Sequence, residues 1–121
     1  MWSLVLIGLG GAAGAVLRYL VNLWSLTWYA GPFPLGTLLV NVAGSLLIGI
    51  GWSTIGNDTT RLLLLTGLLG GFTTFSSFSL ETVRLWEDGQ MTLALWNILL
   101  NNLSAILACM AGYWIGKMLH A

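Results

Sequence analysis

The chain is made almost entirely of four long apolar stretches, and this feature limits its fold more than any other. The stretches cover approximately residues 2–24, 35–55, 62–86 and 92–116. A helix needs about 20 mostly apolar residues to cross the hydrocarbon core of a bilayer, and each stretch is long enough. We therefore predict an all-α membrane protein with four transmembrane helices, forming a single domain over residues 1–121.

The composition agrees with a lipid environment. The sequence is 57% hydrophobic and only 7% charged, whereas soluble domains carry about a quarter charged residues. Most of the seven tryptophans fall near the ends of the apolar stretches, as residues of interfacial belts do. The net charge of zero leaves no basic surface for nucleic acid. We expect the bilayer as a partner, no nucleic acid, and no enzyme, because the apolar stretches offer no Ser/His/Asp set.

The positive charges do not select an orientation in the membrane. Four spans place both termini on one side, together with Arg61 and Lys117, and leave Arg84 and Arg18 for the other side. Orientation follows the excess of Lys and Arg in cytoplasmic loops, and here the comparison is two against two. We predict dual topology, in which the chain inserts both ways and pairs with an inverted copy. The alternative is a fixed topology set by weaker cues.

Neutral polar residues recur at helical spacing inside the spans. Asn amides and Ser or Thr hydroxyls can donate hydrogen bonds to an anion. The middle of each span lacks Asp and Glu, which a cation or proton pathway normally uses, so the pattern favours an anion or a neutral solute. Hydrogen bonding between helices is the alternative for each cluster. The clusters are Arg18 with Asn22; Thr37, Asn41 and Ser45; the segment 70–78; and Asn97, Asn101, Asn102 and Ser104.

The segment GGFTTFSSF, residues 70–78, is unusual for a membrane helix. Gly70 and Gly71 weaken a helix, so we predict a break near residues 70–75. Freed backbone carbonyls could hold a small cation such as sodium, as discontinuous helices do in transporters. Phe75 and Phe78 share a helix face, and the edges of their rings carry partial positive charge that suits an anion. Ordinary packing of the two rings is the alternative from the residues alone.

The sequence resembles the CrcB/Fluc family of fluoride channels over nearly its whole length. The resemblance lies in GGAAGAVLRY (10–19), PLGTLLVNVAGSLLIG (34–49) and GGFTTFSSFSLE (70–81), with a weaker match in ALWNILLNNLSA (94–105). It implies an antiparallel, dual-topology homodimer in the inner or plasma membrane, inserted in both orientations. It also implies two pores per dimer that export cytoplasmic fluoride passively and so give fluoride resistance.

The resemblance also implies roles for particular residues. A structural sodium ion (Na⁺) at the dimer interface is expected on the backbone carbonyls of Gly70 and Thr73, and Arg18 is expected at the aqueous vestibule. The fourth span departs from the usual Ser or Thr at Ala105 and Cys109, so Ser104 is taken as a substitute. The residues expected to line the fluoride pore are Phe75, Phe78, Asn41, Thr37, Asn97, Asn101 and Ser104.

Two other functions compete with this interpretation. A small multidrug-resistance exporter has similar length, four helices and dual topology, but it depends on a glutamate embedded in the first helix. The first helix here carries Arg18 and no acidic residue, which disfavours that class. A membrane scaffold without transport activity would leave the phenylalanines and asparagines without a task.

Overall fold

The computed structural model describes the backbone of residues 1–120 and the side chains of residues 1–119. It is helical throughout, and four of its helical segments are long and apolar enough to cross a membrane, as the sequence predicts. The first span is α1 (Trp2–Leu26) and the second is α2 (Leu35–Thr54). The third consists of α3 (Asp58–Arg61), the π-helix η1 (Leu62–Leu69), α4 (Gly70–Phe72) and α5 (Phe75–Glu87). The fourth consists of α6 (Met91–Leu99), the π-helix η2 (Leu100–Ser104) and α7 (Ala105–His120).

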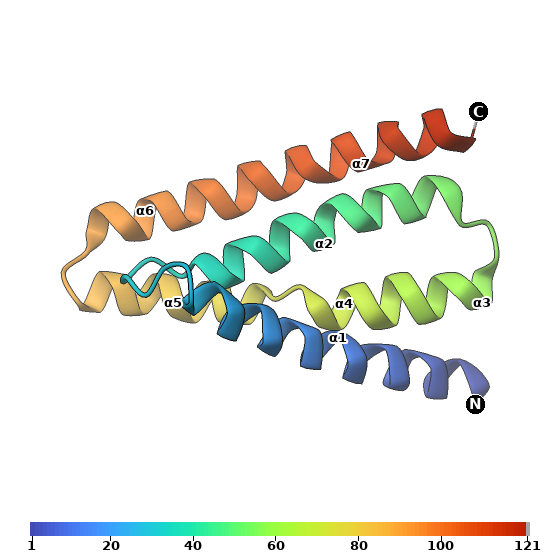
Figure 1. Cartoon of the computed structure of the whole chain (residues 1–121), viewed down its shortest axis with the longest axis horizontal. Coiled ribbons are helices and arrows are strands. Elements are labelled where there is room, and N and C mark those ends of the chain that lie inside the picture. Colours follow the sequence, from blue (N-terminus) through green and yellow to red (C-terminus); the bar gives the residue numbers. More distant parts are fainter. Residues whose placement is uncertain (121) are drawn as a thin grey trace.

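The four spans lie side by side, and their connections alternate between the two ends of the molecule. Figure 1 shows the N-terminus, the C-terminus and the start of α3 at one end, with the loop after α1 and the turn between α5 and α6 at the other. In that turn Gly89 has a positive φ of 77°, which glycine adopts without steric cost. Large apolar side chains are exposed along the outer faces, Trp2 and Leu119 among them, as expected for surfaces that contact lipid.

Glycines bring α1 against the third span. A Cβ atom on Gly71 would lie 2.5 Å from the carbonyl oxygen of Gly11, and one on Gly10 would lie 2.5 Å from that of Leu63. Only glycine permits backbones to approach this closely. The prediction of a break near residues 70–75 rested on Gly70 and Gly71, yet both glycines are helical. Gly71 is required for helix packing instead.

A second glycine contact joins α2 and α7, which form the most extensive helix pair of the structure. A Cβ on Gly116 would lie 2.8 Å from the Ile50 carbonyl oxygen, and one on Gly49 would lie 2.8 Å from the Tyr113 nitrogen. The Ser53 hydroxyl also donates a hydrogen bond across this contact to the Tyr113 carbonyl (3.0 Å). This pair gives the fourth span a fixed position relative to the second.

The start of the third span is capped by a side chain. Asn57 is the N-cap residue of α3, and its side chain accepts a hydrogen bond from the Thr60 N–H (3.0 Å). Asp58 is the first helical residue, where its negative charge complements the helix dipole.

Candidate functional site

Two non-helical residues separate α4 from α5 in the third span. Thr73 (φ −82°, ψ 157°) and Thr74 (φ −150°, ψ 119°) are both extended. Thr74 caps α5, because its hydroxyl accepts a hydrogen bond from the Ser77 N–H (3.1 Å). A bilayer core offers no water to backbone groups that lose their helical partners, so the protein must supply replacements.

Asn41 on α2 supplies the replacement for Thr74. The Thr74 N–H donates to Asn41 Oδ1 (2.8 Å), and Asn41 Nδ2 donates to the Thr74 carbonyl (3.1 Å). The side-chain amide thus binds both backbone groups of one residue, as a neighbouring strand would. Thr74 is 8% exposed, so these bonds satisfy groups that are almost fully buried. Asn41 therefore holds the two spans in register at the point where the third is extended.

A chain of side-chain hydrogen bonds continues from Asn41 into the fourth span. Asn41 Nδ2 donates to Asn101 Oδ1 (2.9 Å), and Asn101 Nδ2 donates to Asn97 Oδ1 (2.8 Å). Asn97 Nδ2 then donates to the Thr82 hydroxyl on α5 (2.9 Å). Asn97 is fully buried and Asn101 is 5% exposed. The network joins α2, α5, α6 and η2 through neutral groups only.

The network leaves few asparagine hydrogens free. An asparagine amide carries two N–H donors, and both hydrogens of Asn41 serve the bonds to Thr74 and Asn101. Asn101 Nδ2 donates to both the carbonyl and the Oδ1 of Asn97. Either residue would have to exchange a partner in order to donate to an anion. Asn41 and Asn101 therefore bond the helices together, which is the alternative that the sequence left open, and any contact with an anion would be an additional role.

Phe75 and Phe78 form an aromatic pair at the start of α5. Their ring centroids are 5.2 Å apart with an angle of 57° between the ring planes, a tilted arrangement that aromatic pairs favour. The two rings differ in environment, since Phe75 is 73% exposed and Phe78 only 7% exposed. Phe78 is part of the monomer's core, whereas Phe75 projects from its surface.

The aromatic pair and the hydrogen-bond network meet at a cavity of about 220 Å³. Four of the seven predicted pore residues line it, namely Asn41, Phe75, Phe78 and Asn101. We call this space the inner cavity. Its remaining wall is made by Thr73, Thr74, Asn102, Ala105 and Ile106. No carboxylate belongs to this wall, which is therefore built from aromatic rings, amides, a capping hydroxyl and small apolar groups.

The other three predicted pore residues lie off this wall. Thr37 is 1% exposed and Asn97 is fully buried, while Ser104 ends η2. Thr74 is not among the predicted site residues, although a Thr directly before the Phe75 helix start is a typical N-cap signal. Asn102, which belongs to a predicted polar cluster but not to the predicted pore, lines the cavity while donating to the Ile98 carbonyl (2.7 Å).

Arg18 lies well inside α1 rather than at its end. It lies eight positions before Leu26, the end of the helix, which corresponds to about 12 Å along the axis. Its Nε donates to the Gly71 carbonyl (3.3 Å), and its own carbonyl accepts from Asn22 Nδ2 (3.0 Å). The guanidinium thus faces the third span close to its extended residues, where its positive charge lies near the inner part of the bundle.

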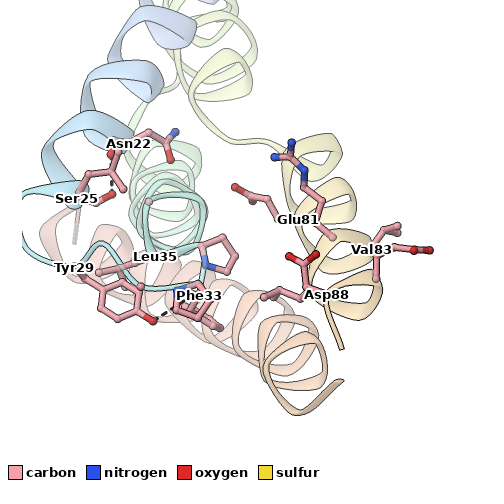
Figure 2. A pocket seen from close by; sticks show the side chains of 16 residues that line it. Asn22, Ser25, Tyr29, Phe33, Leu35, Glu81, Val83 and Asp88 are labelled. Atoms are coloured by element: carbon pink, nitrogen blue, oxygen red, sulfur yellow. Dashed lines mark hydrogen bonds between the residues drawn. The ribbon is translucent and has the colours of Figure 1, made fainter. Parts of the chain in front are cut away.

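A larger cavity of about 640 Å³ opens at the end of the molecule opposite the termini. Figure 2 shows Glu81 from α5 and Asn22 from α1 extending toward the space between the two helices, while Val83 points away from it. Glu81 Oε1 is buried and has no hydrogen-bond partner within the described residues. Arg84 and Asp88 also line this outer cavity, whereas Arg18 does not. Because its wall carries charged side chains, this cavity suits water.

One backbone carbonyl fits a role in holding a small cation. The Thr74 N–H would normally bond to the Gly70 carbonyl, four residues earlier, but it donates to Asn41 instead. Gly70 is also an exposed residue. Sodium takes such oxygens in broken membrane helices. Within the described residues, no group of three or more His, Cys, Asp and Glu side chains gathers as a metal site.

Comparison with known proteins places the chain in a family. The family described as "CrcB-like protein, Camphor Resistance (CrcB)" matches residues 5–113. The chain belongs to the CrcB family. A CrcB relative from Agrobacterium fabrum is 46% identical over 98% of this chain and 99% of its own length. Relatives from Parabacteroides distasonis (43% identical, 97% and 94%) and Clostridium perfringens (40% identical, 95% and 94%) match similarly. Each of the three is named "Fluoride-specific ion channel FluC".

The CrcB assignment confirms the family resemblance read from the sequence. The match includes all the residues of the inner cavity, from Asn41 to Ile106. The relatives are named as ion channels rather than as enzymes or drug exporters. With its four apolar spans, this CrcB protein is a multi-pass membrane protein.

Proposed function

We propose that this protein is a fluoride-selective channel that passively exports cytoplasmic fluoride. The observation that carries the proposal is the inner cavity, where the Phe75 and Phe78 rings stand beside the Asn41–Asn101 amides with no carboxylate on the wall. The relatives named as fluoride channels support the choice of ion.

The chemistry of the cavity suits an ion that is small and strongly hydrated. A channel must replace the water of such an ion, yet bind it weakly enough to release it. Ring edges of Phe75 and Phe78 offer partial positive charge without a fixed charge. The N-terminus of α5 adds to this, because Thr74 and Phe75 at its start line the cavity and the positive end of the helix dipole lies there. The Asn41 clamp keeps this helix start in place.

We infer that the working unit is an antiparallel homodimer with two pores. Phe75 is a large apolar ring that is 73% exposed beside a polar cavity, and an inverted copy would cover it and complete the pore wall. Insertion in both orientations in the inner or plasma membrane provides such a copy. Arg18 bonds to Gly71 far from the helix end, so the cations near the span ends number two against one, and this difference of a single charge gives only a small bias toward one orientation. A reporter fused to the C-terminus tests the dual topology. It should be found on both sides of the membrane, and its appearance on one side only contradicts the inference.

We further propose that the extended residues of the third span lie at the dimer centre, where the carbonyls of Gly70 and Thr73 from both copies hold a structural sodium ion. The support is the Gly70 carbonyl, which lacks its usual helical donor. Exchange of sodium for a large organic cation during purification should lower dimer stability and fluoride efflux together. If both are unchanged, Gly70 and Thr73 do not hold sodium.

A liposome assay tests the main proposal. Protein reconstituted into potassium fluoride-loaded vesicles should release fluoride when valinomycin supplies a path for potassium, and should release no chloride under the same conditions. Coupling to protons together with transport of organic cations would indicate a multidrug exporter instead. A folded, reconstituted protein that passes neither fluoride nor drug would indicate a scaffold and reject the channel.

A further inference from the structure

A groove of about 490 Å³ runs along the contact between α2 and α7. It shares Ile106 with the inner cavity and otherwise has its own lining. Ile48 and Ile106 form its end nearest the middle of the bundle, and Trp52 and Trp114 form its end toward the termini. From Ile106 to Trp114 the groove follows about 12 Å of α7. We call it the α2–α7 groove. Its lining is apolar apart from the polar tips of the aromatic residues and the thiol of Cys109.

Two cations stand over the aromatic end of this groove. The Arg61 Cζ atom lies 4.1 Å from the centroid of the Trp52 ring. The Lys117 Nζ atom lies 5.1 Å from the Trp114 ring centroid and 5.2 Å from that of Tyr113. Tryptophan and tyrosine of membrane proteins are enriched at the level of the lipid head groups. The groove therefore begins at that level, beneath two positive charges, and continues toward the hydrocarbon core.

Arg61 is held in a fixed position at the groove. Its Nε donates to the Ile55 carbonyl (2.6 Å) and one Nη donates to the Trp52 carbonyl (3.0 Å). A guanidinium has five N–H donors, so these two bonds leave donors for another anionic group. Asp58 is exposed at the start of α3, three residues before Arg61. The other three acidic residues, Glu81, Glu87 and Asp88, lie at the opposite end of the molecule. The end that carries the groove is therefore net positive in its side chains.

We propose that the α2–α7 groove binds an anionic phospholipid, with one acyl chain in the apolar groove and the phosphate against Arg61 and Lys117. The inference is independent of the transported ion. The volume matches that of small-molecule sites, about 300–1,000 Å³. Basic residues between transmembrane helices bind anionic head groups. Arg61 and Lys117 provide that charge above the apolar part of the α2–α7 groove.

Native mass spectrometry can test the charge requirement. The protein is released from bilayers that contain both phosphatidylglycerol and phosphatidylcholine, and the ratio of phosphatidylglycerol to phosphatidylcholine that stays bound to it is measured. We expect phosphatidylglycerol to be preferred, and the preference to fall roughly 30-fold in the Arg61→Gln/Lys117→Gln variant, since each cation near the surface contributes about 1 kcal/mol. Lys117→Gln alone, which leaves the carbonyl bonds of Arg61 intact, should reduce it roughly fivefold.

Arg84→Gln is the matched control, because it removes one cation at the opposite end of the molecule. It should leave the preference for phosphatidylglycerol unchanged. An equal loss in Arg84→Gln and Lys117→Gln would mean that lipids respond to net charge only, and this result overturns the proposal. No loss in the double variant overturns it as well.

The position of the acyl chain can be tested at Cys109, which lines the groove and is the single cysteine of the chain. Added phosphatidylglycerol should slow the alkylation of Cys109 by N-ethylmaleimide in detergent, and phosphatidylcholine should slow it much less. A rate that does not respond to either lipid contradicts occupancy of the groove. A thiol that becomes reactive only when the protein is diluted to monomers shows that a second copy, rather than lipid, covers the groove.

Discussion

Replacement of Asn41 by Leu would separate its structural role from a role in conduction. The change keeps a side chain of similar size but removes three hydrogen bonds, two with Thr74 and one with Asn101. Hydrogen bonds between membrane helices contribute about 0.6 kcal/mol each on average. We therefore expect the free energy of unfolding to fall by about 2 kcal/mol, which is roughly a 30-fold change in the unfolding equilibrium.

The loss should reach function through the start of α5. Without the clamp, the backbone of Thr74 loses its partners, and the Phe75 and Phe78 rings lose their fixed position at the inner cavity. Fluoride efflux from liposomes should therefore fall, with unfolding measured in parallel by steric trapping in bicelles. Ser45→Ala, one turn further along α2, is the matched control and should change neither quantity. If Asn41→Leu unfolds like the unchanged protein, the clamp does not hold the two spans together and the reasoning is refuted.

Three further changes test the site and the packing. Phe75→Ile should reduce fluoride efflux while leaving the monomer's stability intact, because that ring is 73% exposed; near-normal efflux would contradict its place in the pore. Phe78→Ile should reduce efflux and also lower thermal stability by about 1 kcal/mol, because the ring is 7% exposed; stability equal to that of Phe75→Ile would argue against its core position. Gly71→Ala should destabilise the fold by roughly 1–3 kcal/mol in thermal unfolding, since the added Cβ would lie 2.5 Å from the Gly11 carbonyl oxygen. Gly8→Ala, where nothing lies within 4 Å, is its control, and an equal effect of both would refute the packing argument.

The residues of the candidate site were predictable in different degrees. Asn41 and Asn101 stood out because an amide in an apolar stretch must find a partner, and the structure joins them at 2.9 Å. The other partner of Asn41, Thr74, could not be identified from spacing, because the two residues lie 33 positions apart and meet only through the packing of two spans. Phe75 and Phe78 share a helix face by periodicity, but the contrast in their exposure depends on which neighbours cover that face.

The glycine pattern shows the same limit. Gly10 and Gly14, and likewise Gly67 and Gly71, have the four-residue spacing of close helix contacts, but only the contact of α1 with η1 and α4 identifies their partners. The effect expected of Gly70 and Gly71, a break in the helix, instead falls three residues later, at Thr73 and Thr74. Helix propensity acts locally, whereas the Asn41 side chain comes from another span and provides the hydrogen bonds that make the extended backbone tolerable.

The sequence by itself determined that this chain is a four-span membrane protein, because its length of uninterrupted apolar residues and its few charges leave no other solvent for its surface. It also determined that polar residues inside the spans needed partners within the protein. Only the tertiary structure decided how they pair: Asn41 with Thr74 and Asn101, Arg18 with Gly71, and Arg61 with Trp52. Those contacts join residues 9 to 60 positions apart in the sequence. Local periodicity does not encode such distances, because they depend on how closely the glycines allow the helices to approach.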